Sequence, residues 1–341
     1  MSLEVGIKDV ALRAGVSPAT ASNALSGARP VSKETRQRVS AVAEAMKYRP
    51  NLVARALRRQ ETKTIALLVG DISNPYYPAV ARAIHDRIGA HGYVSFIGNT
   101  DGDPEAEVRV LEEMRARSVD GVIMGTMALS SERIRSVVGP TMPLVLLTGE
   151  ALESPEHQVR QLRADEVGTD DSIGIREAVA HLRNKGVTDI GYVSGPLGSI
   201  PGTDRLQRFR DAMEDAGLRV DDRWIGFASG YTLETGYDAA ERLLAPSDRP
   251  AAIMCANDLI AIGVLEAARD RGLVVPTDLA VVGFDDIPTA KHVSPRLTTI
   301  INPATLVGYA CADALMRRIE HPDVPFEHTA LPTHLIARGS A

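Results

Sequence analysis

The stretch IKDVALRAGVSPATASN, residues 7–23, decides how the N-terminal part of this chain folds. Apolar residues recur at helical spacing in its first half, and Gly15 then interrupts the pattern where a tight turn is needed. Ser17 suits an N-cap, and Pro18 suits the first position of a second helix because its missing N–H costs nothing there. The stretch therefore predicts a helix-turn-helix, whose second helix presents its first side chains to a DNA major groove.

A third helix is predicted directly after this pair. Ser32 can cap it, and its apolar stripe at Val39, Val42, Ala43 and Met46 closes a small core. Residues 1–49 are thus expected to form an all-α headpiece. Residues 50–63 follow as a hinge that is rich in Arg and has helix-forming composition from Asn51 onward. Because seven or eight residues make too short a helix to be stable alone, we expect the hinge to order only against a partner helix and DNA.

From Thr64 on, short apolar strands alternate with amphipathic helices, a pattern that builds parallel sheets covered by helices. The expected strands are Ile65–Val69, Val94–Gly98, Gly121–Met124, Leu144–Leu147, Ile190–Ser194, Trp224–Phe227, Ala252–Cys255, Ala280–Val282, Thr298–Ile301 and Thr333–Ala337. Helices are expected at 77–91, 104–117, 131–138, 172–185, 203–216, 233–245, 259–271 and 305–320. The series runs twice, which predicts two lobes.

Five motifs in order carry a resemblance that covers the whole chain. They are the headpiece with its hinge, DISNPYY at 71–77, VDGVI at 119–123, CAND at 255–258 and VGFDD at 282–286. Together they resemble the LacI/GalR family of bacterial transcription regulators. The resemblance implies a helix-turn-helix headpiece followed by an α/β two-lobe periplasmic-binding-protein-like domain at 64–341. It also implies discontinuous lobes, expected at about 64–166 with 295–325 and 167–294 with 326–341.

Charge is divided unevenly along the 341 residues. Residues 1–64 hold 12 Lys and Arg against 5 Asp and Glu, whereas the remainder holds 26 against 39, within an overall net charge of −6. A basic module tethered to an acidic body is what binding to DNA phosphates requires.

Several classes of protein are disfavoured. Cys255 and Cys311 lie in apolar segments and are expected to be buried and reduced. No secretory apolar region and no apolar run near 18 residues is present, so a cytoplasmic protein is expected. The sequence lacks a nucleophile elbow, a phosphate loop and a metal-binding His cluster. We therefore expect no enzyme, no catalytic residue, no metal and no cofactor.

The resemblance places Pro18, Ala19 and Asn23 at base-reading positions. Many relatives carry Arg in place of Asn23; since Asn pairs with adenine and Arg with guanine, the operator is expected to depart from the usual half-site. Hydroxyl side chains can bond phosphates, with helix capping as the alternative for each: these are Thr20, Ser22, Ser32 and Thr35.

The hinge carries a sharper expectation. The resemblance implies that Leu57 inserts into a minor-groove base step, although such a Leu can instead be a simple packing contact. The hinge residues expected at DNA are Asn51, Ala54, Arg55, Leu57 and Arg58. Two half-sites need two headpieces, so a homodimer on palindromic double-stranded operator DNA is expected. The resemblance implies the helix at 305–318 and the first lobe as its contact regions.

Ligands of open α/β sheets bind beyond the carboxyl ends of the strands. The residues there mix carboxylate, amide, guanidinium and aromatic groups, as a polyhydroxylated or heterocyclic small-molecule effector needs: Asp71, Asn74, Tyr76, Tyr77, Thr148, Ser199, Arg205, Tyr231, Asn257 and Asp285. For Asp71 and Asn74, a structural role in a turn and helix cap is as good an interpretation as contact with a ligand. Asp258 is expected to cap a helix and Asp286 to bond local backbone.

Two departures from the family pattern keep the effector open. Thr148 stands where a carboxylate is common, and Arg208 replaces a common glycine, where it either binds an anionic effector or faces solvent. The sequence thus predicts a repressor whose operator affinity is controlled by a small molecule between the lobes, most simply a sugar. A nucleobase or a phosphorylated metabolite is the alternative effector, and a solute-binding module without a DNA role is the alternative function.

Overall fold

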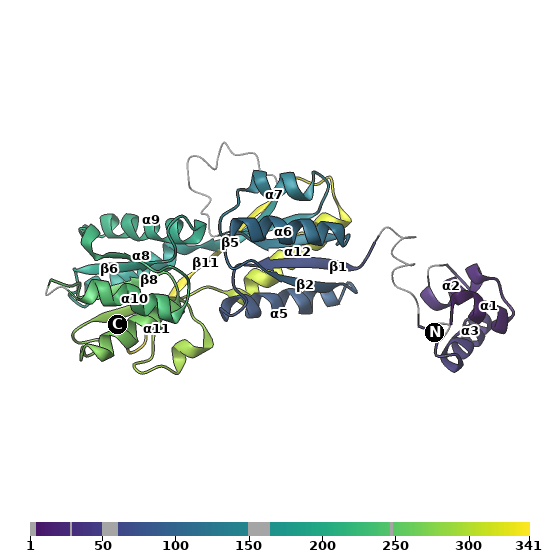
Figure 1. The fold of residues 1–341 in the computed structure, drawn as a ribbon, viewed down its shortest axis with the longest axis horizontal. Coiled ribbons are helices and arrows are strands. Elements are labelled where there is room, and N and C mark those ends of the chain that lie inside the picture. Colours follow the sequence, from purple (N-terminus) through teal and green to yellow (C-terminus); the bar gives the residue numbers. More distant parts are fainter. Residues whose placement is uncertain (1–4, 28, 50–60, 149–163, 246–247) are drawn as a thin grey trace. The chain divides into compact units, whose positions relative to one another are not determined.

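The computed structural model describes residues 5–27, 29–49, 61–148, 164–245 and 248–341 (Figure 1). The chain divides into two compact units, Met1–Thr62 and Lys63–Ala341. The first unit includes the headpiece, residues 1–49, and we call the second unit the body. Each has its own hydrophobic core.

In its described residues the headpiece contains three helices, α1 (Ile7–Ala14), α2 (Pro18–Ser26) and α3 (Lys33–Ala45). Both predicted caps are confirmed, because Ser17 accepts a hydrogen bond from the amide of Thr20 and Ser32 accepts one from the amide of Thr35. Gly15 has φ 66°, the left-handed conformation that the turn between α1 and α2 needs. The three helices enclose a core of Val10, Ala11, Ala14, Ala21, Ala24, Val39 and Ala43.

The described strands of the body form two six-stranded sheets. The first has the order β11 (His328–Pro332), β5 (Asp165–Asp170), β4 (Leu144–Thr148), β3 (Gly121–Gly125), β1 (Thr64–Val69) and β2 (Val94–Asn99), and its pairs are parallel. The second has the order β12 (His334–Ile336), β10 (Thr298–Ile301), β9 (Ala280–Asp285), β8 (Ala252–Cys255), β6 (Ile190–Ser194) and β7 (Ile225–Phe227). Its β10–β12 pair is antiparallel and the others are parallel.

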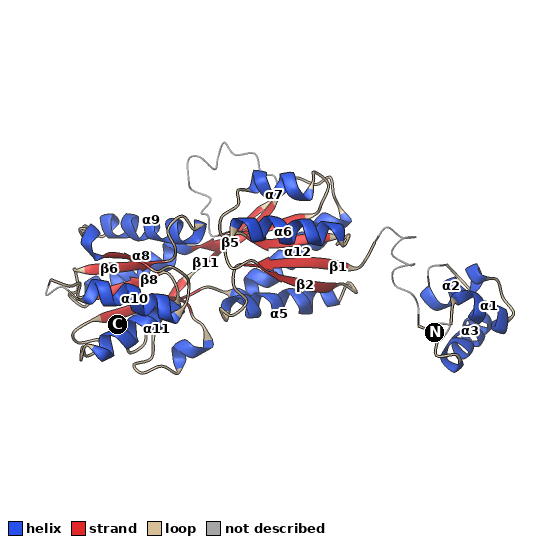
Figure 2. Cartoon of the chain, in the orientation of Figure 1, coloured by secondary structure: helices blue, strands red, loops and turns tan. Residues whose placement is uncertain are grey.

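Helices cover both faces of each sheet, as the alternating pattern predicts (Figure 2). On the first sheet, α5 (Tyr76–Gly89) and α12 (Ala304–Glu320) share one core, whereas α6 (Pro104–Ala116) and α7 (Ser131–Val138) share the other. The helices on the second sheet are α8 (Asp171–Asn184), α9 (Ile200–Asp215), α10 (Leu233–Leu244) and α11 (Asp258–Asp270). The described residues of the body also form two short 3-10 helices, η2 (Asp222–Trp224) and η3 (Pro288–Lys291).

We call the first sheet with its helices the first lobe and the second sheet with its helices the second lobe. The chain passes between the two lobes three times: after β5, after β10 and between β11 and β12. The predicted lobe boundaries therefore need correction at three strands. β10 lies in the second sheet, whereas β11 and the whole of β5 lie in the first. β10 pairs with β9 and β5 with β4, their neighbours in sequence, whereas β11 pairs with β5, a strand far back in the sequence.

Two strands were absent from the prediction. β5 reads DEVGTD and looks polar, but it is buried between β4 and β11, where Asp165 pairs with Arg318 and Glu166 with His328. The predicted terminal strand at 333–337 corresponds to β12 in the second sheet, whereas β11, which directly precedes it in the first sheet, was not predicted. Buried Thr333 lies between them, and its hydroxyl donates to the carbonyl of Asp170.

Candidate functional site

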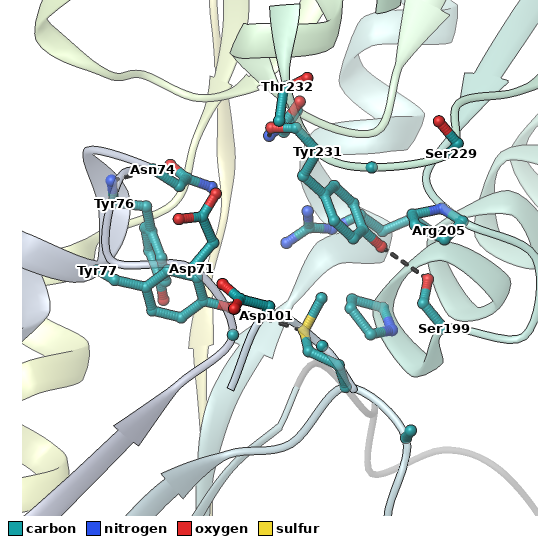
Figure 3. A pocket seen from close by; sticks show the side chains of 18 of the residues that line it. Asp71, Asn74, Tyr76, Tyr77, Asp101, Ser199, Arg205, Ser229, Tyr231 and Thr232 are labelled. Carbon is teal, nitrogen blue, oxygen red and sulfur yellow. Dashed lines mark hydrogen bonds between the residues drawn. The ribbon is translucent and has the colours of Figure 1, made fainter. Parts of the chain in front are cut away.

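A cavity of about 530 Å³ lies between the two lobes of the body (Figure 3). It opens at the carboxyl ends of the strands, where the topology predicts a ligand site. Nine of the ten predicted effector residues line it: Asp71, Asn74, Tyr76, Tyr77, Ser199, Arg205, Tyr231, Asn257 and Asp285. The side chain of the tenth, Thr148 at the end of β4, lies outside the described residues.

The first lobe contributes a turn between β1 and α5. Oδ1 of Asp71 accepts hydrogen bonds from the amide and hydroxyl of Ser73, and Oδ1 of Asn74 accepts one from the amide of Tyr76. Both residues also line the cavity. Asp71 and Asn74 thus have both roles: their side chains stabilise the turn and they line the cavity. The turn bonds also fix the backbone that carries Tyr76 and Tyr77.

Tyr76 and Tyr77 form an aromatic wall. Their rings meet edge to face with centroids 5.4 Å apart, and the hydroxyl of Tyr77 donates to Sδ of Met127 at 3.7 Å. Burial raises the pKa of both phenols. The wall is therefore neutral and offers a ligand apolar ring surface.

Arg205 of α9 is the cation that the second lobe contributes to the cavity. Its Nε donates to Oδ2 of Asp171 and its Nη1 to the carbonyl of Ala256, each at 2.8 Å. The guanidinium lies 3.8 Å above the ring of Phe284. Burial lowers the pKa of Arg205, but the carboxylates of Asp171 and Asp285 outweigh it and the net shift is upward. Arg205 is thus a fixed, already neutralised cation.

Asp285 ends β9 in a left-handed conformation, with φ 115°. Its carboxylate accepts a hydrogen bond of 3.1 Å from Nδ2 of Asn302. Burial raises its pKa to about 6, against opposing contributions from Arg205 and Asn302. A strained backbone and a raised pKa at one residue are typical of a ligand-binding position.

Asn257 caps α11, because its Oδ1 accepts from the amide of Ile260 while its Nδ2 donates to the carbonyl of Tyr231. The prediction that Asp258 is the cap was wrong. Asp258 is fully buried, where it accepts from the hydroxyl of Thr299 and the amide of Ile287. Burial raises its pKa well above the ordinary value.

Two further expectations for charged residues were wrong. Within the described part of the chain Asp286 bonds no local backbone; its carboxylate pairs with Arg338 at 2.5 Å and with Lys291 at 3.6 Å. Arg208 neither lines the cavity nor faces solvent, since it pairs with Asp204 one turn back on α9 and its side chain is 10% exposed.

Tyr231 closes the cavity from the loop before α10. Its hydroxyl lies 2.9 Å from Oγ of Ser199, and the two are hydrogen-bonded (Figure 3). A Cβ on Gly195 would lie 2.3 Å from Cζ of the Tyr231 ring. The sequence therefore keeps a glycine where the ring needs the space.

Sequence reasoning missed part of the cavity wall. Asp101 follows β2 and Met127 follows β3, both at carboxyl ends of strands, so the same topological rule could have found them. Asn302 lies in a crossing segment, which the sequence did not reveal. Other lining residues are Pro196, Leu197, Ser229 and Thr232.

The predicted base-reading residues lie at the start of α2. Pro18 and Ala19 are exposed, and Asn23 is half-buried one turn further on. Among the predicted phosphate contacts, the hydroxyl of Thr20 lies 2.9 Å from that of Ser17, and Ser32 donates to Thr35 at 2.9 Å. Ser22 is half-buried on α2. The predicted hinge contacts lie outside the described residues: Asn51, Ala54, Arg55, Leu57 and Arg58.

Within the described ranges, no helix is long and apolar enough to cross a membrane, and no group of His, Cys, Asp and Glu side chains is arranged to hold a metal ion. Cys255 and Cys311 are buried and unpaired, as predicted.

Two family models match the chain: "Bacterial regulatory proteins, lacI family" over residues 6–51 and "Periplasmic binding protein-like domain" over residues 179–341. The ribose operon repressor of Escherichia coli K12 is 33% identical, over 98% of this chain and 99% of its own length. Catabolite control protein A of Priestia megaterium is 32% identical, over 99% of both chains.

Solved structures of similar proteins match the fold of this chain. The lac repressor dimer bound to operator and an anti-inducer superposes with a TM-score of 0.87 at 25% identity, over 99% of both chains. A LacI family regulator of Enterococcus faecium with bound ribose covers 82% of this chain and 98% of its own, with a TM-score of 0.70 at 27% identity. Since identity above 30% extends over nearly the full length of both chains, this protein belongs to the lacI family of bacterial regulatory proteins.

Proposed function

We propose that this protein is a dimeric, DNA-binding transcriptional repressor whose operator affinity is controlled by a small neutral sugar held between the lobes of the body. One observation carries the proposal: a basic helix-turn-helix unit and a cavity lined by both lobes occur in the same chain. The relatives named above are regulators, and no step of catalysis is proposed. A DNA-regulating role also implies a cytoplasmic location.

The headpiece supports the DNA role. The start of α2 presents Pro18 and Ala19, which offer only apolar contacts, for example to a thymine methyl. Asn23 would supply base hydrogen bonds, and the excess of Lys and Arg in residues 1–64 would supply the phosphate attraction. A solute-binding module without a DNA role would have no use for this unit.

The charge of the cavity supports a neutral effector. Among its lining residues Arg205 is the cation, and Asp171 already neutralises it. Asp71, Asp101 and Asp285 line the same space as carboxylates. A phosphate would meet net repulsion there, whereas sugar hydroxyls can donate to carboxylates and pack their C–H faces on the tyrosines.

The names of two relatives suggest the first sugar to test. One is a ribose operon repressor, and one solved structure holds bound ribose. A nucleobase is the remaining alternative, because three tyrosine rings, Tyr76, Tyr77 and Tyr231, line the cavity. D-ribose is therefore the primary probe and adenine the comparison.

Apolar side chains on the first lobe support the dimer. Val94, Phe96 and Ile97 on the edge strand β2 are 51%, 48% and 49% exposed, and Leu306 and Tyr309 on α12 are also exposed. An unpaired edge with exposed apolar residues is unfavourable in a monomer and is typical of a surface that a partner covers.

Fluorescence anisotropy of the full chain on the DNA upstream of its own gene tests the proposal. Sequence-preferring binding that weakens with salt and shifts with D-ribose, but not with ribose 5-phosphate, is the expected result. Binding without sequence preference at every salt concentration would refute the DNA role. A response to ribose 5-phosphate or adenine alone would refute the neutral-sugar effector and leave the DNA role intact.

A further inference from the structure

We propose that Glu107 positions Met127 so that its carbonyl caps helix α9 of the opposite lobe, and that this contact holds the two lobes in the arrangement described above. The inference concerns the loop Thr126–Leu129 between β3 and α7, which we call the β3 loop. It does not depend on which effector binds or on DNA.

Glu107 is a fully buried carboxylate in the first turns of α6. Its Oε1 accepts a hydrogen bond of 2.7 Å from the amide of Met127, and its Oε2 accepts from the amide of Leu129 at 3.1 Å and the hydroxyl of Thr126 at 3.0 Å. A buried carboxylate costs free energy unless its acceptors are satisfied. Here all three donors come from one loop, so the charge and the loop conformation stabilise each other.

Met127 then reaches the second lobe. Its carbonyl accepts a hydrogen bond of 2.9 Å from the amide of Ile200, the first residue of α9. This bond joins β3-loop backbone to α9 through residues outside the three crossing segments of the chain. Met127 is thus bonded at its N–H to the first lobe and at its carbonyl to the second.

The first turn of α9 explains why the donor is available. Ser199 occupies the N-cap position but makes no side-chain cap bond, since its hydroxyl is hydrogen-bonded to Tyr231. The first amides of a helix have no partner within the helix, and Pro201 has no amide to offer. The Met127 carbonyl therefore serves as the acceptor that α9 lacks within its own lobe, at the positive end of the helix dipole.

The same residue lies in the ligand cavity. The Met127 side chain packs on Gly70, where an added Cβ would lie 2.9 Å from its Cγ, and it receives the hydroxyl of Tyr77. A ligand that contacts Met127 or Ser199 therefore touches a residue at, or next to, the hydrogen bond between Met127 and Ile200 that joins the lobes. Glu107 itself contacts no ligand space and is a positioning residue.

A proline at position 200 tests the contact with little other damage. Ile200→Pro removes the donor N–H at the first helical position, which proline favours, and Ser199 already has the extended conformation that a following proline needs. Ile200→Val is the matched control that keeps the N–H. Glu107→Gln replaces an acceptor oxygen by a donor, and Glu105→Gln on the exposed face of α6 is its control.

Lobe separation is read by pulsed electron paramagnetic resonance between spin labels at Arg133→Cys on α7 and Gln207→Cys on α9, in full-length dimers with both labels on one subunit. Both positions are exposed and the native thiols are buried, so labelling is selective. Loss of one hydrogen bond is expected to raise the ratio of longer to shorter distances about fivefold in Ile200→Pro and Glu107→Gln, with both controls unchanged.

A distance distribution in Ile200→Pro equal to that of Ile200→Val would overturn the contact between the lobes. A shift in Ile200→Pro without one in Glu107→Gln would overturn the positioning role of Glu107. Circular dichroism of each variant confirms folding, and because the two variants act on different bonds, a folding failure in one leaves the other decisive.

Discussion

Nε of Arg205 donates a 2.8 Å hydrogen bond to Oδ2 of Asp171, and the two side chains are 12% and 1% exposed. The pair joins α9 to the start of α8 beneath the cavity. Removing one partner of a buried ion pair leaves the other charge unpaired, so Arg205→Met is expected to destabilise the body by about 3–5 kcal/mol. Urea denaturation of the full chain measures the change.

An exposed ion pair provides the control. Arg82 and Asp86 lie one turn apart on α5, with side chains 78% and 46% exposed. Arg82→Met is expected to cost less than about 1 kcal/mol. The double variant Arg205→Met with Asp171→Leu should recover much of the loss, since neither charge of the pair is then left buried without its partner; equal instability of the single and double variants would show that packing on Phe284 dominates.

The Asp285 pKa predicts a pH dependence of stability. Its folded-state value of about 6 lies above the ordinary 3.8, because burial disfavours the charged form. Between these values the folded state holds a proton that the unfolded state has released. The proton on Asp285 therefore stabilises the folded state in full below pH 3.8. This stabilisation, at most about 3 kcal/mol, is lost as the pH rises through about 6.

Asp285→Asn should remove that part of the pH dependence, and denaturation of both proteins between pH 4 and 7 measures it. Buried Asp258, whose pKa is also raised, acts in the same direction but remains in both proteins. D-ribose affinity of the unmodified chain should rise through the same pH range, because hydroxyl donors prefer the ionised carboxylate. Parallel stability profiles for the two proteins would contradict the assignment.

The sequence was sufficient for the headpiece and for most of the cavity. Ser17 and Ser32 are strong local cap signals, and the residues after strands meet at one edge by topology alone. It failed where tertiary contacts override local pattern. β5 looks polar because the partners of its acids, Arg318 and His328, come from far along the chain. Glu107 shows the same limit, since nothing in the sequence of α6 indicates that this carboxylate is buried and accepts hydrogen bonds from the β3 loop.

Tyr231 depends on the glycine beneath it. In Gly195→Ala the new Cβ would lie 2.3 Å from the ring, so the ring must move and its hydrogen bond to Ser199 is lost. We expect D-ribose affinity, measured by calorimetry, to fall about tenfold. Gly230→Ala is the matched control on the same wall, because its Cβ meets nothing closer than 3.7 Å. Equal affinities in the two variants would separate Tyr231 from ligand binding.

Asn23 on α2 is expected to set one base of the half-site. Asn23→Arg should move the preference at that base pair from adenine toward guanine, whereas Asn23→Ala should relax it at a cost of about 1–3 kcal/mol. Binding selection from a randomised half-site library measures both. Lys33→Ala, at an exposed position of α3, should weaken binding to all sequences alike. An unchanged preference in Asn23→Arg would place base reading elsewhere in the headpiece.

The exposed apolar edge of β2 predicts how the dimer is broken. Phe96 is 48% exposed on a strand whose one partner among the described strands is β1, so a protein partner that covers it would gain the burial of a large aromatic ring. Phe96→Asp is expected to raise the dimer dissociation constant at least about tenfold, as measured by analytical ultracentrifugation. Gln207→Asp, exposed on α9, should leave it unchanged. Because operator binding needs two linked headpieces, Phe96→Asp should also weaken binding to a palindrome far more than binding to a single half-site. A variant that loses both equally would place Phe96 in folding of the first lobe and not in dimerisation.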